Sequence, residues 1–198
     1  MRTLLSVIAL VLAGVAVLWA ATDGFQAFTA ETARRVEVRQ SPRPAPELPL
    51  QLQSGRKTRL SELEGQLVLA TFIYTRCRTM CPMLGMRMKG IRDALAEGVV
   101  GRDVHFLAIS FDPGRDHPAQ LMDYAQRYEA SIENWWVARP RSHLARILDA
   151  FGVVVLPQDN GDFVHNGAFY LLDRDTHLVR IIPGDASKQA VKALREHL

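Results

Sequence analysis

Residues 67–74 (LVLATFIY) form a continuous apolar run that has the length and β-branched content of a buried strand. Apolar residues with helical spacing follow over Met83–Ala96, and this pattern ends at Gly98. A second apolar run, Val104–Ser110 (VHFLAIS), predicts another buried strand. A strand, a helix and a second strand in this order predict an α/β fold.

The rest of the chain continues this alternation and then changes to a hairpin. The predicted elements are a helix over Pro118–Tyr128, a short strand over Trp135–Ala138, a helix over Ser142–Phe151 capped by Ser142, strands over Ala168–Leu172 and Leu178–Ile182, and a helix from Ser187 to the C-terminus. We therefore expect a mixed central sheet with helices on both faces and right-handed crossovers.

The N-terminus has the composition of a membrane anchor or an export signal. Arg2 precedes an apolar stretch, Leu4–Ala21, which is longer than the core of a typical signal peptide and close to the length of a spanning helix. Trp19 fits an interfacial anchor, so residues 1–21 are interpreted as an uncleaved anchor in preference to a cleaved signal. In both cases the remaining chain is expected outside the cytoplasm.

Residues 22–46 are expected to be an extended stalk and linker, because they mix charges with small residues and then become rich in proline. The folded domain is expected over residues 47–198. The formal net charge of +3 is small and dispersed, which argues against a nucleic-acid partner.

The two cysteines, Cys77 and Cys81, lie four residues apart directly after the first strand and at the start of a helix. Residues four apart on a helical turn face the same way, so both sulfurs can meet one ligand or each other, and a helix N-terminus favours the thiolate. A structural disulfide is the alternative, but so short a loop would constrain the unfolded chain little. The placement favours a reactive or metal-binding pair, with Cu(I) or zinc as the metal.

Two thiolates need a third ligand, and His165 is the candidate that the sequence favours. It stands in the segment NGDFVHN, which leads directly into the predicted strand Ala168–Leu172 and can reach the edge where the first strand ends. The other histidines occupy ordinary strand, turn, helix-surface or terminal positions: His105, His117, His143, His177 and His197.

Three segments resemble the Sco (SenC) family. FIYTRCRTMCP (72–82) resembles its CxxxCP segment, SFDPGRDHP (110–118) its DPxRDxP stretch, and DFVH (162–165) with FYLLD (169–173) its histidine loop and following strand. The resemblance covers about residues 48–198 together with the N-terminal anchor. Two features depart from the family pattern: Asn166 stands where a serine is common after the histidine, and Arg76 and Arg78 surround the first cysteine.

The resemblance implies a thioredoxin-like fold that binds copper, as Cu(I) and also as Cu(II), through Cys77, Cys81 and His165. It implies a metallochaperone, not an enzyme, that assists assembly of the copper centre of cytochrome c oxidase. The implied partners are the copper-bearing subunit of the oxidase and a thiol reductant or another copper chaperone, because the thiols must be reduced before metal binds. The implied location is a bacterial inner membrane, with the domain in the periplasm.

Other functions remain open on the sequence. A thiol-disulfide oxidoreductase that keeps the oxidase cysteines reduced would use Cys77 and Cys81 alone, although C-x-x-C spacing is absent. A peroxidase of the peroxiredoxin kind is disfavoured, because Thr75 and Thr79 each lie two residues before a cysteine and not three. A structural module with a disulfide is a third possibility.

Several further residues, most of them near the cysteine motif, allow two interpretations each. Four methionines crowd the cysteine helix and suit either copper transfer or core packing: Met80, Met83, Met86 and Met88. Asp112 suits either orientation of the metal loop or a turn before Pro113. Of the adjacent Trp135 and Trp136, one ring is expected to face the core and the other the solvent.

Overall fold

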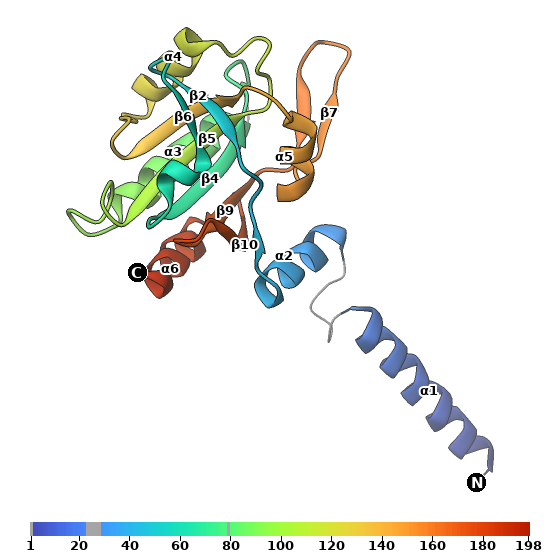
Figure 1. Cartoon of the computed structure of the whole chain (residues 1–198). Helices are drawn as coiled ribbons and strands as arrows, with labels where there is room; N and C mark the ends of the chain where they lie inside the picture. The colour runs from blue at the N-terminus through green and yellow to red at the C-terminus, as the bar shows by residue number, and fades with distance from the viewer. Residues whose placement is uncertain (1, 23–28, 79) are drawn as a thin grey trace.

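The computed structural model describes residues 2–22, 29–78 and 80–198, with backbone only at residues 2–4. An eight-stranded mixed sheet forms its centre, in the order β1-β10-β9-β4-β5-β6-β2-β3, and a two-stranded sheet, β7–β8, projects from one end (Figure 1). The strands are β1 (Arg43–Pro44), β2 (Pro49–Leu52), β3 (Lys57–Arg59), β4 (Leu67–Ile73), β5 (Val104–Ser110), β6 (Trp135–Pro140), β7 (Val155–Pro157), β8 (Phe163–His165), β9 (Ala168–Leu172) and β10 (His177–Pro183).

Strands β4, β5 and β6 are parallel to one another, and β9 pairs with β4 in the antiparallel direction. Every residue of β4 and β5 is buried, as their continuous apolar runs predict. The predicted β9–β10 hairpin is confirmed, with Leu172 opposite Leu178.

The helices are α1 (Arg2–Ala21), α2 (Ala30–Gln40), α3 (Met80–Asp93), α4 (Pro118–Arg127), α5 (Leu144–Phe151) and α6 (Ser187–His197), with a short 3-10 turn at Leu60–Leu63. Phe72 contacts Phe151 of α5 at a ring-centroid distance of 5.3 Å. Phe106 and Trp135 lie on the opposite face, where Tyr128 at the end of α4 stacks on Trp135. Helices therefore cover both faces of the sheet, as predicted.

Helix α2 corrects the expectation of an extended stalk for residues 30–40. It packs beside β10, and Val36 and Val38 are buried. The Arg34 guanidinium donates to the backbone oxygen of Gly152 at 2.8 Å, which ties α2 to the end of α5. Residues 23–28 of the predicted stalk lie outside the described residues, and Arg43–Pro44 at its other end pairs with β10 as strand β1.

Helix α1 stands apart from the domain in Figure 1 and exposes apolar side chains from Leu5 to Trp19. Within the described part of the chain, no helix is both long enough and apolar enough to cross a membrane. Membrane anchorage stays a prediction.

Two local expectations were wrong. Helix α5 begins at Leu144, and its N-cap position is occupied by His143 in a left-handed conformation, not by Ser142. Both Trp135 and Trp136 are buried. The Trp136 ring is covered by Arg56, whose guanidinium lies 5.4 Å from the ring centroid, and by His105 at 4.9 Å.

Candidate metal centre

The two cysteines lie where β4 ends and α3 begins. Cys77 belongs to the connecting loop, and its backbone N–H donates to the Tyr74 carbonyl at 3.2 Å. Cys81 is the second residue of α3, and its backbone N–H donates to the Cys77 sulfur at 3.2 Å. Both side chains are thiols, and both are buried. The expected placement at a strand-to-helix corner is confirmed, while Thr79, between them, lies outside the described residues.

His165 lies beside the cysteines although it is distant in sequence. It is the last residue of β8, and its Nε2 atom lies 3.6 Å from the Cys81 sulfur. Its Nδ1 atom lies 3.3 Å from the backbone oxygen of Asn166. A carbonyl oxygen only accepts hydrogen bonds, so this contact favours a proton on Nδ1 and leaves the Nε2 lone pair directed towards Cys81.

A cluster of aromatic rings holds the β7–β8 hairpin against the end of β4. Phe163 contacts Tyr74 at a centroid distance of 5.2 Å and Phe111 at 5.5 Å. The His165 ring lies 4.9 Å from Phe111. Because side chains alternate along a strand, Phe163 and His165 both face this cluster while Val164 is exposed. The hairpin thus presents the imidazole to the cysteine loop.

Asn166 fastens the same hairpin to two helices. Its Oδ1 atom accepts the backbone N–H of Val154 at 2.8 Å, and its Nδ2 atom donates to the Gly152 oxygen at 3.0 Å. Nδ2 also lies 3.4 Å from a carboxylate oxygen of Glu31 in α2. The amide therefore connects the end of β8 with the chain after α5 and with α2.

Asp116 is a structural residue of the site that sequence reasoning missed. Its carboxylate is fully buried and accepts the Thr75 backbone N–H at 3.0 Å and the Thr75 hydroxyl at 2.6 Å. It also accepts the Ser110 hydroxyl at 2.5 Å. Asp116 thereby joins the start of the cysteine loop to the end of β5. The motif resemblance included this residue, but nothing local in the sequence indicated its hydrogen-bond partners.

Asp112 lies at the rim of the site. Its carboxylate pairs with Arg115 at 2.6 Å and more distantly with Arg76 at 3.9 Å. Its backbone oxygen accepts N–H groups of the following turn, including that of Asp116 at 2.9 Å. The turn-forming reading is therefore supported. The Arg115 guanidinium also covers the Phe163 ring at 5.4 Å from its centroid.

The site raises the pKa values of Cys81 and Tyr74. A hydrogen bond with the Cys77 side chain, together with burial, raises the pKa of the Cys81 thiol far above its usual range. This corrects the expectation that the helix N-terminus would lower it, because the neighbouring sulfur and the loss of water outweigh the helix dipole. Burial also raises the pKa of Tyr74 to about 12. The raised pKa favours the protonated form of the Cys81 thiol.

The methionines divide between the core and the surface. Met88 is fully buried, which supports the packing interpretation, whereas Met83 and Met86 are 51% and 60% exposed. Met80 lies against the turn before β9, where a Cβ atom on Gly167 would approach its sulfur to 2.5 Å. The structure thus places two exposed thioethers on α3, the helix that carries Cys81.

The other histidines lie away from the cysteines. His105 is buried in β5, and His117 Nδ1 lies 2.8 Å from an Arg139 nitrogen. His177 forms a partly exposed group with Asp173 and Asp175 in the β9–β10 turn, where one possible ligand atom from each lies within 4.8 Å of the others. Asp173 also accepts backbone N–H groups from both of those residues, as a turn-forming aspartate does.

Comparison with known proteins identifies the relatives of this chain. Residues 38–198 match the protein-family model described as SCO1/SenC. The SCO1 protein homolog of Bacillus subtilis (strain 168) is 32% identical over 135 residues, which cover 66% of this chain and 68% of that protein.

Solved structures share the fold. BsSco, described as a member of the Sco family of cytochrome c oxidase assembly proteins in which a disulfide switch was identified, is 27% identical and superposes with a TM-score of 0.67 over 79% of this chain and 94% of that one. Bradyrhizobium japonicum ScoI with copper bound is 23% identical and superposes with a TM-score of 0.65 over 78% and 99%. These likenesses confirm the predicted thioredoxin-like α/β fold.

Proposed function

The chain belongs to the SCO1/SenC family, and we propose that it binds copper through Cys77, Cys81 and His165 and assists assembly of the copper centre of cytochrome c oxidase. The observation that carries this proposal is the 3.6 Å approach of His165 Nε2 to the Cys81 sulfur, across 84 positions of sequence. In this role the chain carries copper as cargo and need not turn over a substrate.

The donor atoms suit a single soft metal ion. Ligand sulfur and imidazole nitrogen bind a tetrahedral metal such as zinc at about 2.3 and 2.0 Å, which places two neighbouring donors roughly 3.5 Å apart. The observed separation of 3.6 Å agrees with this value. Two thiolates and one neutral imidazole favour Cu(I) over hard cations. Metal binding would displace the Cys81 proton, so loading is expected to release protons.

A thiol-disulfide oxidoreductase is the second candidate. The four-residue spacing and the contact of the Cys81 N–H with the Cys77 sulfur bring the two cysteines together. Oxidation to a disulfide would remove two electrons and two protons and would abolish the metal site, so a thiol reductant is a required partner in either role. This candidate gives His165 no role, whereas the copper carrier requires it.

We place the domain outside the cytoplasm, anchored to a bacterial inner membrane by the N-terminal helix. The apolar sequence of α1 and its exposed side chains support this location. The exposed β7–β8 hairpin, with Val164 and Leu156 pointing outward opposite each other, would then be available to the copper-bearing subunit of the oxidase.

Anaerobic titration of the fully reduced chain with Cu(I), in competition with a chelator, tests the proposal. We expect one equivalent to bind and His165→Ala to weaken binding at least tenfold, which corresponds to about 1.4 kcal/mol. His143→Asn is the matched control, because His143 is exposed and asparagine tolerates its left-handed conformation. Equal Cu(I) affinity of the wild type and His165→Ala would instead favour the oxidoreductase.

A further inference from the structure

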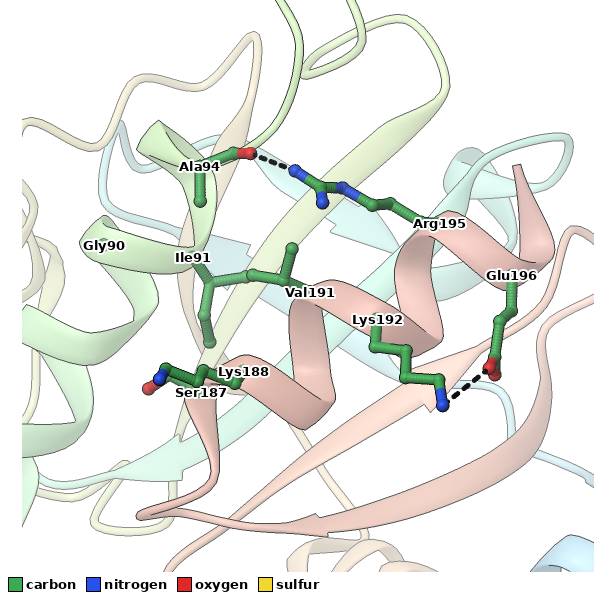
Figure 2. A pocket seen from close by; sticks show the side chains of 9 residues that line it. All are labelled: Gly90, Ile91, Ala94, Ser187, Lys188, Val191, Lys192, Arg195 and Glu196. Carbon is green, nitrogen blue, oxygen red and sulfur yellow. Dashed lines mark hydrogen bonds and ion pairs between the residues drawn. The ribbon is translucent and has the colours of Figure 1, made fainter.

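A groove with an apolar floor and a cationic rim lies between α3 and α6 (Figure 2). Its volume is about 620 Å³. The floor is formed by Gly90, Ile91 and Ala94 of α3 with Val191 of α6, and the rim by Lys188, Lys192, Arg195, Ser187 and Glu196. Lys192 is 77% exposed at its side chain, so its amine can reach a ligand outside the protein.

A second groove flanks α6 on its other side, between α6, α2 and β10. Ile181, Ile182 and Ala193 contribute apolar atoms to it, and Arg35, Arg39 and Arg180 contribute guanidinium groups. We call the two grooves and the exposed side of α6 between them the α6 face. Cationic side chains thus line both edges of one helix.

Acidic groups only partly balance the charge of the α6 face. Glu196 pairs with Arg180 at 3.0 Å and Lys192 at 3.8 Å. Glu31 pairs with Arg35 at 3.2 Å. Lys188 and Arg195 add positive charge, and the Arg195 guanidinium also donates to the Ala94 backbone oxygen at 3.0 Å, which keeps it at the groove (Figure 2). The face therefore remains cationic.

One part of the α6 face, helix α2, is close in sequence to the proposed membrane segment. Helix α2, which supplies Arg35 and Arg39, is the first helix after α1. In Figure 1, α6 and α2 lie on the same lower side of the domain as α1, whereas the β7–β8 hairpin projects at the upper right. A surface held near a bilayer by α1 would meet it with this cationic side.

We propose that the α6 face binds the headgroups of anionic phospholipids and thereby fixes the orientation of the domain on the membrane. The cationic rims match the phosphate charge, and the apolar groove floors match the upper part of an acyl chain. The inference rests on the proposed membrane association of α1. It implies that the β7–β8 hairpin, which projects on the other side of the domain in Figure 1, stays clear of the bilayer.

Lysine footprinting of the full chain on vesicles tests this orientation. Vesicles of phosphatidylcholine alone are compared with vesicles that also contain phosphatidylglycerol, and an amine-acetylating reagent is followed residue by residue. We expect labelling of Lys188 and Lys192 to slow by about threefold or more with phosphatidylglycerol, and the protection to disappear at about 0.5 M NaCl. Lys57, exposed on β3, is the internal reference and should label equally in both.

Variants show whether the protection of the lysines arises from charge or only from the nearby bilayer blocking the reagent. Arg39→Gln with Arg195→Gln should lose most of the protection, while the matched pair Arg59→Gln with Arg141→Gln, exposed elsewhere on the domain, should retain it. Equal labelling of Lys188 and Lys192 on the two vesicle types would overturn the proposal, whether the two lysines are then as reactive as in the lipid-free protein or equally protected on both. Salt-reversible binding to phosphatidylglycerol vesicles only would support the α6 face and contradict anchorage by α1. Binding to neither vesicle would contradict both.

Discussion

At the scale of single residues, some groups of the candidate site have partners nearby in the sequence, and others have partners far away in it. Cys77 and Cys81 are four residues apart, so their spacing alone predicted that both sulfurs can meet one ligand or each other. Asn166 and Asp116 act through distant partners, namely Gly152 and Thr75, and nothing in their local sequence indicates those contacts. The cysteine pair could therefore be predicted from the sequence, whereas the hydrogen bonds that hold the surrounding loops could not.

Asp116→Asn should destabilise the protein by about 2–4 kcal/mol, because a buried charge with several donors is replaced by an amide whose N–H group would face one of those donors. Urea unfolding monitored by circular dichroism measures the change. Asp123→Asn, at an exposed position of α4, is the control and should stay within about 0.5 kcal/mol of the wild type. A loss for Asp116→Asn no larger than that of the control would show that the network does not stabilise the loop.

His105 should make stability depend on pH. Burial, with a smaller effect from Arg56, lowers the pKa of His105 to about 4, and its Nε2 atom has no hydrogen-bond partner among the described residues. The unfolded chain therefore takes up a proton below about pH 6.5 while the folded chain does not, so stability falls from about pH 6.5 to pH 4, by up to about 3 kcal/mol.

Urea midpoints of the wild type and His105→Leu at pH 7 and pH 4.5 measure this contribution. The variant should lose less stability than the wild type between the two pH values, because leucine does not titrate. The same loss in both proteins would assign the pH dependence to other groups.

At the scale of helices and strands, strongly apolar elements were predicted and weakly apolar ones were not. The runs of β4 and β5 are buried along their whole length, which makes the pattern unambiguous. Helix α2 buries only Val36 and Val38 among many charged residues, so its sequence resembles a solvated linker. Strands β7 and β8 have three residues each, which is too few to show an alternation of apolar and polar residues. Their position depends on the aromatic cluster around Tyr74.

Two glycines of α3 should respond to alanine in opposite directions. A Cβ atom on Gly85 would lie 2.5 Å from the Tyr128 ring, while one on Gly90 would meet nothing within 4 Å. Gly85→Ala should therefore destabilise by about 1–3 kcal/mol through overpacking, and Gly90→Ala should stabilise by about 0.5–1 kcal/mol through helix propensity. Thermal unfolding of the two variants measures both effects. Stabilisation by both would show that α3 and Tyr128 separate easily.

Removal of α2 should weaken the domain and loosen the hairpin that carries His165. A chain that starts at Glu47 lacks the buried Val36 and Val38, the Arg34 contact with Gly152 and the Glu31 contact with Asn166. Its thermal unfolding midpoint should fall by several degrees relative to a chain that starts at Thr29, since each buried valine contributes about 1.5 kcal/mol or more. Equal midpoints would restore the interpretation of residues 22–46 as a stalk.

At the scale of the whole molecule, the sheet brings the site together. Because β9 runs antiparallel to β4, with Thr71 opposite Phe169, the chain that enters β9 lies beside the chain that leaves β4. The Thr71 hydroxyl donates to the Ala168 oxygen at 2.9 Å and closes this junction. His165 and the cysteines therefore meet at one edge, as the position of His165 before a strand predicted.

The central claim is that two sulfurs and one imidazole from this edge hold one copper ion. X-ray absorption spectroscopy of the reduced chain loaded with one equivalent of Cu(I) measures that donor set directly. We predict a first shell of two sulfur atoms and one nitrogen at roughly 2.3 and 2.0 Å, with outer-shell scattering typical of imidazole that disappears in His165→Ala. A first shell of sulfur alone, unchanged in His165→Ala, would contradict the account.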